Sequence, residues 1–114
     1  MEELPGQGEV IFLRFPYSDL KGYKNRPALV LTPLERDDML VCGITSQPYT
    51  DPRAIVIREG DFAEGRLPLA SYVRPMKMFT AHRSIVTRRN GRLKAEVVNR
   101  VLDRIVDVLR GAES

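Results

Sequence analysis

The sequence has little of what metal sites and disulfides need. Its 114 residues include one cysteine, Cys42, and one histidine, His82, with no Cys-x-x-Cys or His-x-x-x-His pair. A zinc site therefore lacks a ligand set, and we expect neither a metal nor another cofactor. Cys42 lies in the apolar run MLVCGIT and cannot form an internal disulfide, which predicts a buried thiol and a reducing compartment.

No stretch of the sequence predicts a membrane span or a secretion signal. None of its uninterrupted apolar runs approaches about 18 residues, the length that a bilayer requires. The N-terminal stretch MEELPGQGEV is acidic, whereas a signal peptide begins with basic residues followed by an apolar run. The lack of a membrane span and of a signal peptide predicts a cytoplasmic protein. A glycine-rich loop that could cradle phosphates is also missing.

The length and composition fit a single domain that spans residues 1–114. Hydrophobic residues make up 43% of the chain, which suffices for one small core. Lysine and arginine number 18 against 15 acidic residues, giving a net charge of +3 and a pI near 9.3. This mild excess permits an anionic partner without requiring one, so the positions of the charges are more informative than their sum.

Short apolar runs bounded by proline and glycine occupy the first three quarters of the chain. Such runs predict the strands of a mainly β fold, a small closed barrel. The expected strands are Glu9–Phe15, Ala28–Thr32, Met39–Ile44, Arg53–Arg58, Ser71–Met78 and Ser84–Thr87. The charged stretch Pro16–Pro27 predicts a mobile surface loop between the first two strands. Pro75 predicts a strand edge or a bulge.

The C-terminal part predicts one amphipathic helix, Lys94–Arg110, ended by Gly111. Its apolar residues recur at helical spacing, namely Val98, Val101, Leu102, Ile105, Val108 and Leu109. We expect this face to be buried, either on the barrel of the same chain or at a dimer interface. Before the helix, Asn90-Gly91 predicts either a type I′ hairpin turn or the link into the helix.

Arg26 stands directly before Pro27, at the start of the apolar run ALVLT. A residue before proline is held in an extended conformation, so the Arg26 guanidinium would be presented at a fixed angle. A guanidinium never deprotonates and offers a rigid set of donors, which suits a phosphate group. The alternative interpretation is a solvated cation at a strand edge.

Three hydrogen-bonding side chains, Thr45, Ser46 and Gln47, follow another apolar strand. Serine and threonine often end strands because they begin turns, and that interpretation stays open. A hydroxyl close to a fixed arginine would instead form a two-donor pocket for a phosphoryl oxygen. Such a pocket stabilises the charge that develops at phosphorus during transfer.

The segment Ser71–Arg83 contains three further cations, Arg74, Lys77 and Arg83, and the only histidine. By strand periodicity, Arg74 should share one face with Met76, and Lys77 should lie on the opposite face. A lone histidine such as His82 is more often a surface residue than a catalyst, and both interpretations stay open. The basic stretch TRRNGRLK predicts either a solvated turn or a nucleic-acid contact.

In their order and spacing, the blocks GEVIFLRF, NRPALVL, VCGITSQ and SYVRPMKMFT resemble the MazF/PemK family of toxins. The resemblance extends from Gly8 to the C-terminal helix. It implies an SH3-like β-barrel of the CcdB/MazF type with a C-terminal α-helix, assembled as a homodimer. It also implies an endoribonuclease toxin of a type II toxin–antitoxin system, restrained by a cognate antitoxin with a disordered acidic segment.

The chemistry that the resemblance implies needs no metal. In that family the ribose 2′-hydroxyl attacks the adjacent phosphate of single-stranded RNA, leaving a 2′,3′-cyclic phosphate and a 5′-hydroxyl end. The family's catalytic arginine and threonine fall on Arg26 and Thr45. The expected RNA-binding residues are Lys24, Asn25, Ser46, Gln47, Arg74 and Lys77, and Tyr17, Tyr23 and Tyr49 are candidate stacking surfaces.

Two features depart from the family pattern. The first loop lacks the Gly-Ser-Glu-Gln stretch of some members, and Met76 occupies the position of a family aspartate. A proton acceptor for the 2′-hydroxyl is therefore not identified, although His82 and Asp19 are alternatives. A CcdB-like gyrase poison, or an inactive or RNA-binding barrel, would share the fold. The pairing of Arg26 with Thr45 favours the ribonuclease, because a gyrase poison needs no phosphate pocket.

Overall fold

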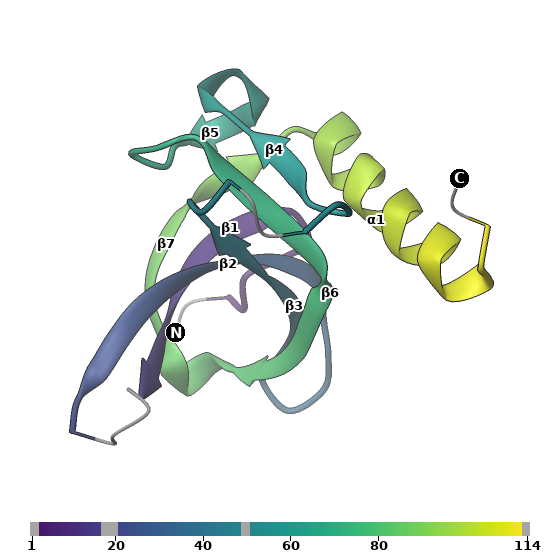
Figure 1. The fold of residues 1–114 in the computed structure, drawn as a ribbon. Helices are drawn as coiled ribbons and strands as arrows, with labels where there is room; N and C mark the ends of the chain where they lie inside the picture. The colour runs from purple at the N-terminus through teal and green to yellow at the C-terminus, as the bar shows by residue number, and fades with distance from the viewer. Residues whose placement is uncertain (1–2, 17–20, 49–50, 113–114) are drawn as a thin grey trace.

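The strands of the computed structural model form one antiparallel sheet that curls into a half-barrel (Figure 1). The structure describes residues 3–16, 21–48 and 51–112. Its strands are β1 (Glu9–Pro16), β2 (Tyr23–Pro33), β3 (Asp38–Thr45), β4 (Ile55–Ile57), β5 (Phe62–Gly65), β6 (Ser71–His82) and β7 (Val86–Leu93). They lie in the order β4-β6-β3-β2-β1-β7-β5, and helix α1 (Ala95–Arg110) follows. The predicted mainly β fold with a C-terminal helix is confirmed.

The two strands β2 and β3, in the middle of the sheet, are buried on both of their faces. Because successive side chains of a strand point to opposite sides, each strand contributes to two apolar clusters. Leu29 and Cys42 belong to the cluster that also contains helix residues. Val30 and Val41 belong to the second cluster. Burial on both faces explains why these strands read as uninterrupted apolar runs, and the Cys42 thiol is buried as expected.

Helix α1 packs on the first cluster with four buried residues, Val97, Val98, Val101 and Ile105. Each such side chain contributes roughly 1.5–3 kcal/mol when it leaves water. Gly111 ends the helix with a φ of 67°, as predicted. The barrel of the same chain covers only part of the predicted apolar face, because Leu109 in the last turn is 71% exposed. No helix in the described ranges is long and apolar enough to cross a membrane.

The expected loop Pro16–Pro27 is wrong over its second half. Strand β2 begins at Tyr23 and pairs with β1 from Tyr23 to Leu29, so that Asn25 faces Arg14 and Arg26 faces Leu13. The β1–β2 pair extends beyond the rest of the curled sheet (Figure 1). The charged sequence of this extension resembles a loop because only one neighbouring strand, β1, pairs with it and leaves its side chains exposed.

The Asn90-Gly91 signal lies inside strand β7 and makes neither a hairpin turn nor the link into the helix. Gly91 has a φ of 129° and pairs with Gly65 of β5, a strand that the sequence did not predict. The expected strand Ser84–Thr87 begins instead with the 3₁₀ turn η2 (Arg83–Ile85) and continues as β7. The positive φ of Gly91 therefore accompanies an unusually close approach of the paired strands β5 and β7.

Candidate active site

Arg26 and Thr45 come together because β2 and β3 pair in an antiparallel ladder. At the end of this ladder Ala28 faces Gly43. Arg26 stands two positions before Ala28, and Thr45 stands two positions after Gly43. In an antiparallel pair such positions lie opposite each other and on the same side. Pro27 has no N–H to extend the ladder, so the strands separate where the two polar side chains begin.

Strand β6 contains a bulge at the height of these residues. The β3–β6 register shifts between Cys42 and Ile44, so several β6 residues face a single β3 residue there. Pro75 is buried in this irregular stretch. Because proline cannot donate to a ladder, a bulge is where a strand tolerates it. The expected edge or bulge at Pro75 is confirmed.

At this bulge, Arg74 and Lys77 both line one groove of about 490 Å³, which we call the Arg74 groove. Arg74, Met76 and Lys77 all line it, so the prediction that Lys77 lies on the opposite face is wrong. The bulge breaks the strict alternation on which that prediction rested. Among the described residues, no partner accepts a hydrogen bond from the buried Nε of Arg74. A buried donor without an acceptor is costly, and Arg74 would have to reorient for this Nε to donate to an anion in the groove.

A second groove of about 270 Å³, the Asn25 groove, adjoins the first. The two grooves share Arg26, Pro27, Ile44 and Thr45. The sequence-predicted site residues are distributed between them, with Arg74 and Lys77 in the first and Lys24, Asn25, Ser46 and Gln47 in the second. Arg26 and Thr45 thus stand at the junction of the two grooves, in contact with both.

The junction is electropositive. The described residues that line the two grooves include four cations, Lys24, Arg26, Arg74 and Lys77, and no Asp, Glu or His. The Arg26 side chain is exposed, and no hydrogen bond or ion pair within the described residues engages it. Like charges held together in a groove favour an anionic ligand, because the ligand relieves their mutual repulsion.

Local hydrogen bonds orient two of the polar side chains. The backbone N–H of Gln47 donates to Thr45 Oγ1 at 3.1 Å, so the Thr45 hydroxyl oxygen is held as an acceptor. The Thr87 hydroxyl donates to Asn25 Oδ1 at 3.1 Å, with the Phe12 carbonyl oxygen also within reach at 3.3 Å. These contacts use only the oxygens of Thr45 and Asn25, so the Thr45 O–H and the Asn25 side-chain N–H groups can donate to a ligand.

His82, one of the two candidate proton acceptors, lies away from this junction. His82 faces Asp38 at the far end of β3, and its Nδ1 lies 3.0 Å from the Ser84 hydroxyl at the start of η2. The catalytic interpretation of His82 therefore gains no support, and Met76 in the Arg74 groove offers no carboxylate. Asp19 lies outside the described residues.

The model of the PemK-like, MazF-like toxins of type II toxin–antitoxin systems matches residues 6–109 of this chain. The chain belongs to this family. A comparison with curated protein sequences found no match.

Solved MazF structures have the same fold. A MazE–MazF crystal structure (Form III) from Deinococcus radiodurans aligns with a TM-score of 0.75 at 22% identity, covering 97% of this chain and 100% of that chain. An endoribonuclease in complex with its cognate antitoxin, from a mycobacterial species, aligns with a TM-score of 0.70 at 16% identity, covering 99% of each chain. The Mycobacterium tuberculosis toxin MazF-mt6 aligns with a TM-score of 0.65 at 18% identity, covering 88% of this chain and 96% of that one.

The site of this MazF/PemK toxin also has an apolar lining that the sequence did not indicate. Phe12 and Leu69 line the Asn25 groove, and Phe79 lines the Arg74 groove. Leu69 is 65% exposed within the stretch RLPLA, and the available sequence signal was two leucines on either side of a proline just before a strand. Of the tyrosines expected to stack, Tyr23 is exposed with the Arg14 guanidinium 5.3 Å from its ring centre. Tyr17 and Tyr49 lie outside the described residues.

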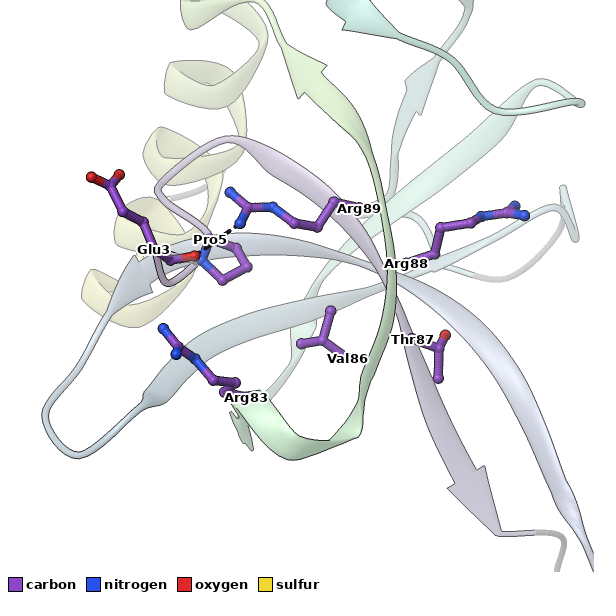
Figure 2. A pocket seen from close by; sticks show the side chains of 7 residues that line it. All are labelled: Glu3, Pro5, Arg83, Val86, Thr87, Arg88 and Arg89. Atoms are coloured by element: carbon purple, nitrogen blue, oxygen red, sulfur yellow. Dashed lines mark hydrogen bonds between the residues drawn. The ribbon is translucent and has the colours of Figure 1, made fainter. Parts of the chain in front are cut away.

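Another basic groove of this MazF/PemK toxin, about 470 Å³, lies beside β7 and is lined by Arg83, Arg88 and Arg89 (Figure 2). Here the Arg89 guanidinium is already bound, since it donates to both carboxylate oxygens of Glu9 at 2.9 Å. It also donates to the Glu3 carbonyl oxygen at 2.8 Å. This arginine fastens the N-terminal segment to β7, so its charge is neutralised in a way that the charge of Arg26 is not.

Proposed function

We propose that this protein is a metal-independent endoribonuclease that cleaves single-stranded RNA at selected sequences, as part of a type II toxin–antitoxin system. The observation that supports it is the meeting of Arg26 and Thr45 at the junction of two basic grooves, the first of which Arg74 also lines. Cationic and hydroxyl donors at one site suit a phosphodiester whose charge increases in the transition state. Such a toxin would act in the cytoplasm, where messenger RNA is found.

The proposed reaction is a transesterification. The ribose 2′-oxygen forms a bond to phosphorus as its proton leaves, and the bond from phosphorus to the 5′-oxygen breaks as that oxygen gains a proton. The products are a 2′,3′-cyclic phosphate and a 5′-hydroxyl. Arg26, Arg74 and the Thr45 hydroxyl would bind the nonbridging oxygens of the phosphate. They would bind these oxygens more tightly in the pentacoordinate transition state than in the substrate.

In this proposal the Asn25 groove holds the bases. Asn25, Ser46 and Gln47 would donate to and accept from base edges of an unstacked strand, which is how proteins usually read RNA sequence. Lys24 and Lys77 would bind neighbouring phosphates.

The decisive experiment incubates the purified protein, with excess chelator, on a long single-stranded RNA and maps the ends. We expect discrete cuts with 5′-hydroxyl ends, at least about 10²-fold slower in Arg26→Ala, by analogy with loss of an oxyanion donor. Arg100→Ala is the matched control, because this exposed helix arginine lines neither groove. If chelated wild-type protein leaves the RNA intact, or Arg26→Ala cuts equally well, the proposal gives way to a binding barrel or a gyrase poison.

We also propose that a cognate antitoxin covers the junction with an acidic segment, because four cations line the two grooves. Such binding should weaken as salt rises. Antitoxin binding that is insensitive to salt would contradict this part of the proposal.

A homodimer is the third part of the proposal. The exposed Val106 and Leu109 of α1 form an apolar patch that a second copy would cover. A monomeric mass in solution that does not change with concentration would contradict it.

A further inference from the structure

A third groove, which we call the Arg66 groove, continues the proposed RNA site away from the cleaved bond. Its volume is about 770 Å³, and its wall includes Leu67, Pro68 and Leu69, which also line the Asn25 groove. The two grooves therefore meet along the segment that connects β5 to β6. An RNA strand that leaves the Asn25 groove across this segment would meet the Arg66 groove next.

Three arginines line the Arg66 groove, namely Arg58, Arg66 and Arg88. The one acidic residue among its described lining residues is Glu59, so the groove remains net positive. Arg58 and Arg66 are exposed, and within the described residues their guanidinium groups form no ion pair or hydrogen bond. These two cations are thus available to an anion from solution.

Arg88 stands between the Asn25 and Arg66 grooves in a fixed orientation. Its guanidinium lies 5.0 Å from the ring centre of Phe12, a residue of the Asn25 groove. Its Nε donates to Asn90 Oδ1 at 2.9 Å. Figure 2 shows Arg88 leaving β7 on the side opposite to Arg89. The stacked, anchored guanidinium keeps its terminal N–H groups for a ligand at small entropic cost.

We propose that the Arg66 groove binds the phosphates of nucleotides that flank the cleaved bond in single-stranded RNA. This inference rests on the proposed ribonuclease function and extends its substrate contacts. Single-stranded RNA alternates anionic phosphates with flat apolar bases. The groove wall likewise combines the three arginines with the exposed Leu69 and with Pro68. An acidic peptide would satisfy the charges but would leave that apolar surface unused.

The test compares the double variant Arg58→Ala/Arg66→Ala and the single variant Arg88→Ala with a charge-matched control, Arg100→Ala/Arg110→Ala, on helix α1. Each is assayed on a long RNA and on a short RNA limited to the cleaved bond and its immediate neighbours. We expect the double variant to lose roughly 10-fold in kcat/KM on the long RNA, through KM, and to cut the short RNA as wild type does. Arg88→Ala should behave similarly.

Binding of an RNA with a 2′-deoxy nucleotide at the cut site, followed by fluorescence anisotropy over a range of salt, provides a readout without cleavage. The slope of log affinity against log salt should decrease by about 0.7 for each arginine that contacts a phosphate. The helix control should leave the slope unchanged. Melting curves of the variants should match wild type, since Arg58 and Arg66 are exposed.

The outcomes separate this inference from the proposed function. Normal cutting and binding of long RNA by the double variant would overturn the inference and leave the ribonuclease standing. If wild-type protein cuts no RNA, the proposed function fails, and the inference is still decided by whether the double variant loses the salt-dependent RNA binding. If the arginine variants lose binding to polyglutamate but not to RNA, the groove is a protein-binding surface and the inference is wrong.

Discussion

The Thr45 hydroxyl oxygen accepts a hydrogen bond from the Gln47 N–H at 3.1 Å, where the Arg74 and Asn25 grooves meet. A hydroxyl held as an acceptor can still donate its one proton, here to a phosphoryl oxygen. Thr45→Val keeps the shape and strand preference of the side chain but removes this donor. We expect kcat to decrease by about 10²-fold, whereas Thr45→Ser should stay within about 10-fold of wild type. Single-turnover cleavage at saturating RNA measures both, and a valine variant with wild-type kcat would exclude Thr45 from catalysis.

The contact between Thr87 and Asn25 predicts a second effect, on selectivity. The Thr87 hydroxyl holds the Asn25 amide at 3.1 Å, so Thr87 acts as a positioning residue for a proposed base reader. We expect Asn25→Ala to reduce the preference for the best cleavage site over the second-best site by about 10-fold, because one contact to a base is lost. Thr87→Val should cause a smaller change in the same direction, with kcat unchanged.

The control for this prediction is Thr80→Val, because Thr80 is an exposed β6 threonine that lines neither groove. It should leave the cleavage pattern unaltered. A Thr87→Val protein that lowers kcat uniformly at all sites, without a change in pattern, would show that Thr87 has only a structural role.

The central part of the site was predictable from sequence because its residues follow apolar runs. Arg26 precedes one such run and Thr45 ends another, and antiparallel pairing of neighbouring strands brings those two ends together. The lining from β6 was predictable only in part. Arg74 is where the alternation placed it, but the bulge at Pro75 moved Lys77 into the same groove. Alternation by itself cannot show how many residues a bulge inserts.

The strands that the sequence did not reveal depend on distant partners. Strand β5 (FAEG) has a single buried residue, Phe62, and β7 is largely polar, yet the two strands pair with each other. Gly65 and Gly91 meet there because neither has a side chain. An Asn-Gly pair is locally a turn signal. Only the tertiary contact with β5 makes it part of a strand.

The same contact predicts a stability effect at Gly91. A Cβ added there would lie 2.1 Å from the Glu64 carbonyl oxygen, and the φ of 129° disfavours any other residue. Gly91→Ala should therefore destabilise the protein by about 2–4 kcal/mol, by separating β5 from β7. Gly60→Ala is the control, since nothing lies within 4 Å of its added Cβ. Urea unfolding measures both, and equal midpoints for the two variants would contradict the close approach.

Cys42 is predicted to be inert in the native protein. Burial raises the pKa of its thiol from 9.0 to about 12. The thiolate is the reactive form, so Ellman's reagent at mildly alkaline pH should label the thiol only as the protein unfolds. Because the folded pKa is the higher one, the contribution of this thiol to stability is complete below pH 9.0 and is lost as the pH rises toward 12. Stoichiometric labelling of the native protein would contradict the burial.

The turn between β2 and β3 predicts a gain in stability. Arg36 and Asp37 have φ values of 56° and 65°, and the Asp38 N–H donates to the Glu35 carbonyl oxygen at 3.1 Å. This is a type I′ turn without the glycine or asparagine that it favours. Arg36→Gly should raise the free energy of unfolding by about 0.5–1 kcal/mol, because glycine adopts positive φ without a steric penalty.

Arg36 is the better of the two positions to change, because the Asp37 carboxylate pairs with the Arg83 guanidinium at 3.8 Å and a glycine there would lose that pair. The turn lies at the end of β2 opposite to Arg26, so RNA cleavage should be unaffected. Glu35→Gly is the control, since Glu35 lacks positive φ and should only gain flexibility in the unfolded chain, lowering stability by a few tenths of a kcal/mol. If chemical denaturation shows Arg36→Gly to be no more stable than Glu35→Gly, residue 36 is not strained and the assigned turn geometry is wrong.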